Sequence, residues 1–172
     1  MNTAASAYSK KRKSPYVINN IRVTPKSIKI GYEYLKGGRV ESYTLGSAEK
    51  PRPELYDAMK NLASHVASLL EIENLNLNHR IKPTLVKYAY DNNGMMSAVI
   101  ESNFSIPLSG AHVVIRTPSK QEPFDPEKNT DEKKYLFPNT VDALRKVQDE
   151  AELYIKGERA QGSLFDGVKN SK

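Results

Sequence analysis

The sequence predicts an α+β fold, with a mainly antiparallel sheet packed by two helices in the order strands, helix, strands, helix. Several short runs show the apolar alternation of half-buried strands, and two longer stretches show the apolar spacing of an amphipathic helix. Glycine-containing turns separate neighbouring strand runs. Hairpins covered by helices bury one face of a sheet, which is a common solution for small domains.

The first half of the chain predicts three strands. Val17 to Val23 forms a short apolar run, and Ser27 to Leu35 places alternate apolar side chains on one face. Lys36 to Arg39 contains two glycines, which supply the positive φ angles of a tight hairpin turn. Arg39 to Leu45 then returns as the partner strand.

The first helix is predicted to begin at Pro53 and to end between Glu71 and Asn74. Proline suits the first turn of a helix, and Glu54 and Asp57 complement the helix dipole. Apolar residues recur at steps of four and three along one stripe: Leu55, Met59, Leu62, Val66 and Leu69.

The second half repeats the arrangement of strands followed by a helix. Strands are predicted over Thr84 to Tyr90, Met95 to Ser105 and Gly110 to Thr117, with an Asn-Gly turn after the first. The second helix is predicted to start near Asn139 as its N-cap and to stop at Gly157. Its apolar stripe comprises Val141, Leu144, Ala151 and Ile155.

Charge divides the chain into three parts. Of the net charge of +6, residues 1–16 carry +4, because Lys10, Lys11, Arg12 and Lys13 stand there without an acid. We therefore expect a disordered basic arm over 1–16, a single α+β domain over 17–156 and a flexible tail over 157–172. The four cations are candidate contacts to nucleic-acid phosphates, and the alternative is a solubilising chain end.

Composition argues against most well-marked enzyme classes. Without cysteine there is no thiolate nucleophile, disulfide or Cys-ligated zinc. The three histidines lack metal-site spacing, and neither a phosphate-binding glycine loop nor a nucleophile elbow is present. We expect no cofactor, no metal and no enzymatic activity, and a catalytic site of scattered residues is the remaining alternative. No apolar run approaches about 18 residues, so we expect no membrane partner and a cytoplasmic location.

Tyrosines on two strands raise the possibility of base stacking. Tyr32 and Tyr34 share one face of their strand, as do Tyr88 and Tyr90 of theirs, and Lys29, Lys36, Arg39 and Lys87 lie nearby in sequence. Aromatic rings among cations can form a platform for single-stranded nucleic acid. The alternative is that tyrosine simply favours half-buried strand faces.

The C-terminal tail carries a short motif. Gln161-Gly162-Ser163-Leu164-Phe165 resembles the peptide with which bacterial proteins bind the sliding clamp, the DNA polymerase III beta subunit. The resemblance implies that Leu164 and Phe165 fill an apolar pocket of the clamp, with Gln161 and Ser163 making contacts beside them. It covers five residues, and Gly162 replaces the frequent leucine, which implies modest affinity. An apolar pair in a polar tail suits partner binding.

These features predict a non-enzymatic accessory protein of DNA replication, repair or recombination that docks on the sliding clamp and touches DNA. Its small size fits a phage or mobile-element protein. The alternative is a phage or bacterial structural protein whose tail mediates self-association. A further alternative is that Leu164 and Phe165 fold back onto the second helix.

Overall fold

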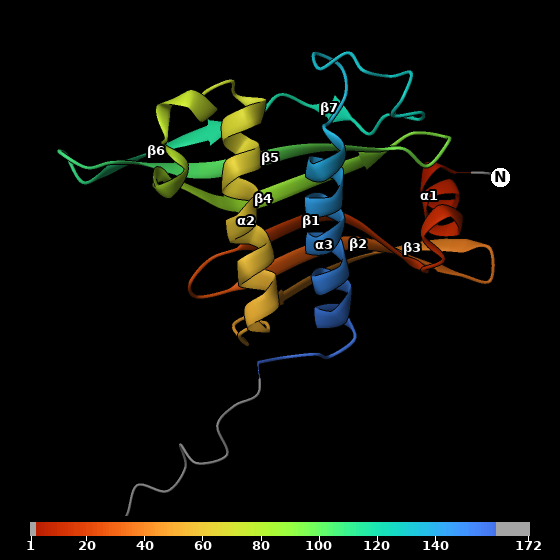
Figure 1. The fold of residues 1–172 in the computed structure, drawn as a ribbon. Coiled ribbons are helices and arrows are strands. Elements are labelled where there is room, and N and C mark those ends of the chain that lie inside the picture. Colours follow the sequence, from red (N-terminus) through yellow and green to blue (C-terminus); the bar gives the residue numbers. More distant parts are fainter. Residues whose placement is uncertain (1–2, 161–172) are drawn as a thin grey trace, which may run out of the picture.

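The computed structural model describes residues 3–160, and it is an α+β fold with an antiparallel sheet (Figure 1). The sheet order is β3-β2-β1-β4-β5-β6, and the short strand β7 pairs with β5. The strands are β1 (Tyr16–Val23), β2 (Ile28–Lys36), β3 (Arg39–Ser47), β4 (Ile81–Tyr90), β5 (Met96–Ile106), β6 (Ala111–Arg116) and β7 (Lys120–Gln121). The α-helices are α1 (Ala4–Arg12), α2 (Pro53–Leu69) and α3 (Pro138–Ile155), and the 3-10 turns are η1 (Glu73–Leu75) and η2 (Asn78–Arg80).

Helices α2 and α3 lie side by side across one face of the sheet (Figure 1). The core lies between these two layers, where Ile21, Ile30 and Val86 of neighbouring strands meet Leu62 and Leu144 of the helices, all fully buried. Amphipathic helices and an antiparallel sheet each have one apolar face to bury, so this two-layer packing satisfies both.

The strands predicted from alternation are confirmed to within three residues at each end. The hairpin turn between β2 and β3 has positive φ at Gly37 and Gly38, as the tight turn requires. Helix α2 begins at the predicted Pro53. Helix α3 begins at Pro138, and Phe137 occupies the N-cap without a side-chain hydrogen bond, so the predicted N-cap at Asn139 is wrong.

The prediction of two helices is also wrong, because residues 4–12 form α1 and the order begins with a helix. Thr3 caps α1, its Oγ1 accepting a hydrogen bond from the Ser6 N–H at 3.2 Å. Tyr8 of α1 is 1% exposed and packs against Tyr90 with ring centroids 4.0 Å apart. The expected disordered arm is therefore a docked helix over most of its length, because one buried aromatic side chain anchors it.

The two halves of the sheet meet at a short junction between β1 and β4. Only three residues of each strand pair there, Asn20–Arg22 with Leu85–Lys87. Beyond one end of this junction α1 packs against both strands. Gly94 lets the chain pass close to that helix, because a Cβ on it would lie 2.9 Å from the backbone of Ala7 and Tyr8.

Candidate nucleic-acid interface

Four tyrosines gather on three neighbouring strands and form what we call the tyrosine surface: Tyr16, Tyr32, Tyr34 and Tyr43. The strand register places Tyr16 opposite Tyr34 and Tyr32 opposite Tyr43. Ring centroids are 5.0 Å apart for Tyr16 and Tyr34, 6.0 Å for Tyr16 and Tyr32, and 5.4 Å for the stacked pair Tyr32 and Tyr43. The rings therefore form one continuous aromatic patch.

The sequence of β2 explains why this patch forms. Ile28, Ile30, Tyr32 and Tyr34 alternate along one strand face, and the two isoleucines are buried in the core. The same face then continues beyond the helix layer, where tyrosines replace isoleucines. Tyrosine suits this boundary, since its ring is apolar and its hydroxyl can remain in water. Tyr43 is 44% exposed, and the other three rings are half-buried.

The pKa values of two phenols of the tyrosine surface, Tyr32 and Tyr43, are raised. The Tyr43 hydroxyl donates a hydrogen bond to the Glu41 carboxylate, and this bond raises the pKa of Tyr43. Burial raises the pKa of Tyr32, and the neighbouring Tyr16 adds to the effect. The Glu41 carboxylate is an anion within this patch, whereas the protonated rings of Tyr32 and Tyr43 are uncharged and can accept a stacked base.

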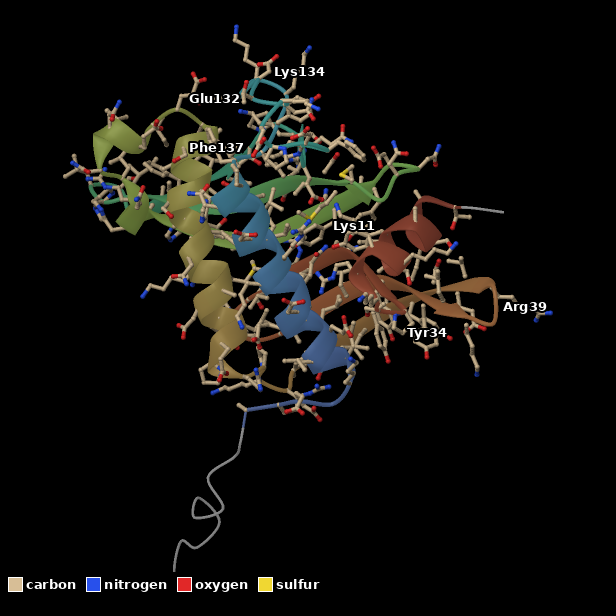
Figure 2. The ribbon with its side chains drawn as sticks, turned by 45° about the vertical axis from the view of Figure 1, so that its right-hand side comes forward. Lys11, Tyr34, Arg39, Glu132, Lys134 and Phe137 are labelled. Atoms are coloured by element: carbon tan, nitrogen blue, oxygen red, sulfur yellow. The ribbon has the colours of Figure 1, made fainter. Side chains whose placement is uncertain are left out.

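Cations surround the tyrosine surface. Lys156, which follows α3, places its ammonium 5.4 Å from the Tyr16 ring centroid. Lys36 and Arg39 face each other across the β2–β3 turn, and Lys13 precedes Tyr16 by three residues. Lys13, Lys36 and Arg39 are exposed and form no ion pair within residues 3–160. In Figure 2, Tyr34 and Arg39 lie on the same side of the molecule as Lys11 of α1.

Of the four cations predicted to contact nucleic acid, Lys11 and Arg12 form ion pairs with acidic side chains of the protein. Lys11 pairs with the buried carboxylate of Glu122 at 3.1 Å. Arg12 pairs with Asp149 and donates to the side-chain oxygen of Gln148 at 2.9 Å. Lys10 and Lys13 are exposed. The basic segment thus serves first to fasten α1 to α3 and to the loop after β7, and only part of its charge faces solvent.

The second tyrosine pair named from the sequence has a different environment. Tyr88 is 6% exposed and its hydroxyl donates to the Leu144 carbonyl at 3.0 Å. The Tyr90 hydroxyl donates to the Ile18 carbonyl and accepts a bond from Gln148 Nε2 at 2.8 Å. These side chains lie beneath α1 and α3, so the possible base platform at Tyr88 and Tyr90 is wrong, and the structural alternative is correct there.

Sequence reasoning found two members of the tyrosine surface and missed Tyr16 and Tyr43. A signal for Tyr43 was present, because Tyr32 and Tyr43 are equally distant from the turn at Gly37-Gly38 and so face each other in an unbulged hairpin. Tyr16 had no such signal. A bulge between Ile18 and Asn20 shifts the register of β1, and only the folded structure reveals the resulting pairing.

The sheet face opposite the helices carries a second, smaller group of cations. Arg22 and Lys29 alternate with buried core residues, lie directly opposite each other in the register and are both exposed. Like charges in this position destabilise a strand pair slightly. This pair lacks neighbouring exposed aromatic rings in the register, so it serves as a matched control for the tyrosine surface.

The predicted clamp-binding residues Gln161, Ser163, Leu164 and Phe165 lie outside the described residues. The last described residue is Ala160, whose N–H donates to the Lys50 carbonyl at 3.1 Å. Just before it, the Arg159 guanidinium pairs with Glu49 at 2.7 Å. The start of the tail is thereby attached to the loop between β3 and α2.

Within residues 3–160 no group of three or more His, Asp or Glu side chains is arranged to hold a metal ion. His65 Nδ1 lies 2.9 Å from Thr140 Oγ1, linking α2 to α3, and burial lowers the pKa of this histidine. Among the described helices, none combines the length and the apolar character needed to cross a membrane.

Comparison with known proteins gives no match: no family model, no curated protein and no solved structure is similar to this chain. Functional inference therefore rests on the chemistry of the described surfaces and on the sequence of the tail.

Proposed function

We propose that this protein is a non-enzymatic accessory protein of DNA replication, repair or recombination. It binds single-stranded DNA on the tyrosine surface and docks on the bacterial sliding clamp through Gln161, Ser163, Leu164 and Phe165. The observation that carries the proposal is the continuous patch formed by Tyr16, Tyr32, Tyr34 and Tyr43. Lys36 and Arg39 stand at the end of its hairpin and form no ion pair with any residue of 3–160.

Stacking supplies affinity without sequence preference. Every base has a π-face, and stacking on an aromatic side chain contributes about 1–3 kcal/mol per base. Tyr34 and Tyr43 lie one on each strand of the exposed hairpin. Lys36 and Arg39 stand at its tip, where they can contact the phosphates on either side of a stacked base. The expected ligand is a short single-stranded segment, because bases in a duplex do not offer their faces.

The clamp motif complements this weak DNA site. A protein held on a clamp that encircles DNA experiences a local DNA concentration on the order of millimolar, so a modest site is sufficient. The substitution of Gly162 for leucine in the motif removes one apolar contact, and modest affinity for the clamp is then also expected. Two weak contacts acting together give binding that is specific for clamp-loaded DNA.

The DNA part of the proposal is tested with the full chain and a fluorescein-labelled single-stranded DNA oligonucleotide. Tyr34→Ala and Tyr43→Ala should each weaken binding about 5- to 150-fold, the equivalent of about 1–3 kcal/mol. The matched control is Arg22→Gln combined with Lys29→Gln, which removes two charges from the opposite face and should change affinity much less. Equal losses in both sets would show non-specific electrostatic binding and contradict the site.

The clamp part is tested by titrating a bacterial sliding clamp with the full chain. Saturable binding is expected for the native sequence, and Leu164→Ala combined with Phe165→Ala should abolish it while leaving the folded core unchanged. Equal binding by the double variant would contradict the assignment of these two side chains as anchors.

Self-association through the tail is the second candidate. The start of the tail is attached at Lys50, which borders an apolar pocket on the same chain. A tail that fills this pocket on a neighbouring copy would give oligomers that grow with concentration. Sizing the native chain against the Leu164→Ala, Phe165→Ala variant distinguishes the two, since only self-association predicts that the variant loses its oligomers.

A further inference from the structure

A pocket of about 620 Å³ lies beyond the end of the β1–β4 junction that faces away from α1. It is bordered by the end of β1, the start of β4 and the first turns of α2. Its lining includes Val23, Lys50, Met59, Lys60, Ile81 and Lys82. The volume lies within the range of sites that hold small ligands or anchor side chains.

The pocket has an apolar interior and a basic rim. Val23, Met59 and Ile81 are buried core residues that reach its wall. Lys50, Lys60 and Lys82 are exposed at its edge, and no acidic side chain of residues 3–160 lines it. The complementary ligand has an apolar body and carries negative charge beside it.

The C-terminal tail meets both requirements and starts next to the pocket. Ala160 is hydrogen-bonded to Lys50, which itself lines the pocket. Leu164 follows four residues later and can lie up to about 14 Å from Ala160, since an extended chain spans about 3.3–3.6 Å per residue. Phe165 and Asp166 come next, so an apolar pair and a carboxylate are within reach of the pocket.

We infer that Leu164 and Phe165 of the chain's own tail occupy this pocket, with Asp166 facing the lysines of the rim. Closing so short a loop costs little conformational entropy, and the attachment at Ala160 keeps the local concentration of the two side chains high. The occupant is therefore the tail of the same molecule, in preference to that of a second copy.

This arrangement regulates the activity proposed above, and that consequence rests on the proposed function. Leu164 and Phe165 cannot fill the pocket and the clamp at the same time. The apparent affinity for the clamp is reduced by the fraction of molecules with a free tail. Variants that open the pocket should bind the clamp more tightly, and variants that lose the anchors should not bind it at all.

The direct test needs no clamp, and the absence of cysteine in the native chain makes it simple. A nitroxide attached at Val168→Cys in the otherwise native full chain reports on nearby amides by broadening their NMR signals. We expect loss of signal intensity at Val23, Met59 and Ile81. Leu164→Ser combined with Phe165→Ser in the labelled chain should restore these signals.

Lys60→Glu combined with Lys82→Glu serves as the second variant, because both side chains are exposed and the fold should tolerate the exchange. It should also restore the signals by repelling Asp166. Unbroadened pocket signals in the native labelled chain would overturn the inference. A mixed sample distinguishes binding within one molecule from binding between two. It contains isotope-labelled chains without nitroxide, whose signals are observed, and nitroxide-labelled chains without isotope. Broadening in that mixture would assign the pocket to another molecule's tail and overturn the intramolecular arrangement.

Discussion

Two groups of tyrosines in this molecule differ in what covers them. Tyr8 projects from α1 into the core, Tyr88 and Tyr90 of β4 lie under α1 and α3, and each hydroxyl has a protein partner. The tyrosine surface lies on the same sheet face beyond the helices, where Tyr43 is 44% exposed. Alternation along a strand places a ring on one face of the sheet, whereas the helix above that face decides whether the ring is buried or available to a ligand.

The hydrogen bonds of the buried group form a chain across four elements. The Tyr8 hydroxyl donates to Gln148 Oε1 at 2.5 Å, Gln148 Nε2 donates to the Tyr90 hydroxyl, and that hydroxyl donates to Ile18. Such a network holds α1, α3, β4 and β1 in one arrangement. The buried tyrosines should therefore affect stability, and the tyrosine surface should affect binding.

The largest expected effect comes from Tyr8→Ala. Removing a fully buried aromatic side chain should lower the free energy of unfolding by about 3–5 kcal/mol, and α1 should detach. Urea unfolding measures this loss. The single-stranded DNA affinity of the folded fraction should change little, and a large stability loss from Tyr43→Ala instead would reverse the assignment of the two groups.

A smaller loss is expected for Gln148→Leu. This exchange keeps most of the volume but leaves the hydroxyls of Tyr8 and Tyr90 without one partner each, at a cost of about 1–3 kcal/mol. The same urea experiment measures it. An unchanged free energy of unfolding for Gln148→Leu would contradict this prediction. It would show that the hydrogen bonds of Gln148 add nothing to stability beyond the packing of its side chain.

Alkaline pH should destabilise the fold through the buried tyrosines. Burial raises the pKa of Tyr88 and Tyr90 well above the ordinary value and also raises that of Tyr8. Below pH about 10 these three hydroxyls are protonated in both the folded and the unfolded chain. Above that pH the unfolded chain loses these protons first, so the free energy of unfolding should fall as the pH rises. Tyrosinate absorbance measured together with circular dichroism should show these three ionising only as the fold is lost.

The smallest effect concerns charge at the hairpin tip. Lys36→Gln combined with Arg39→Gln removes two cations that form no ion pair in the described part of the chain. The slope of log affinity for single-stranded DNA against log salt should fall by about 1.4, since each contact contributes about 0.7. An unchanged slope would place the phosphates elsewhere.

Local sequence signals predicted most of the fold. The turn at Gly37-Gly38 and the stripe of α2 were readable because each depends on residues close in the chain. Helix α1 was not, since Tyr8 is its one large apolar side chain and its partners Gln148 and Asp149 lie more than a hundred residues away. Long-range partners of this kind leave no periodicity in the sequence.

The candidate site was also predictable only where it depends on residues close together in the chain. Tyr32 and Tyr34 could be placed on one face by alternation, but their separation from Tyr88 and Tyr90 depends on where α1 and α3 end. The pocket beside Lys50 had no sequence signal, because it arises where β1 and β4 stop pairing after three residues. The clamp motif depends on the tail sequence alone.

Tyrosine fluorescence during a titration with single-stranded DNA tests the central claim most directly. The chain has no tryptophan, so its emission comes from tyrosine, and a base stacked on a ring quenches it. We predict saturable quenching that is largely lost when Tyr34→Ala and Tyr43→Ala are combined in a chain that remains folded. Binding without quenching, or quenching that survives this double substitution, would contradict the tyrosine surface as the DNA site.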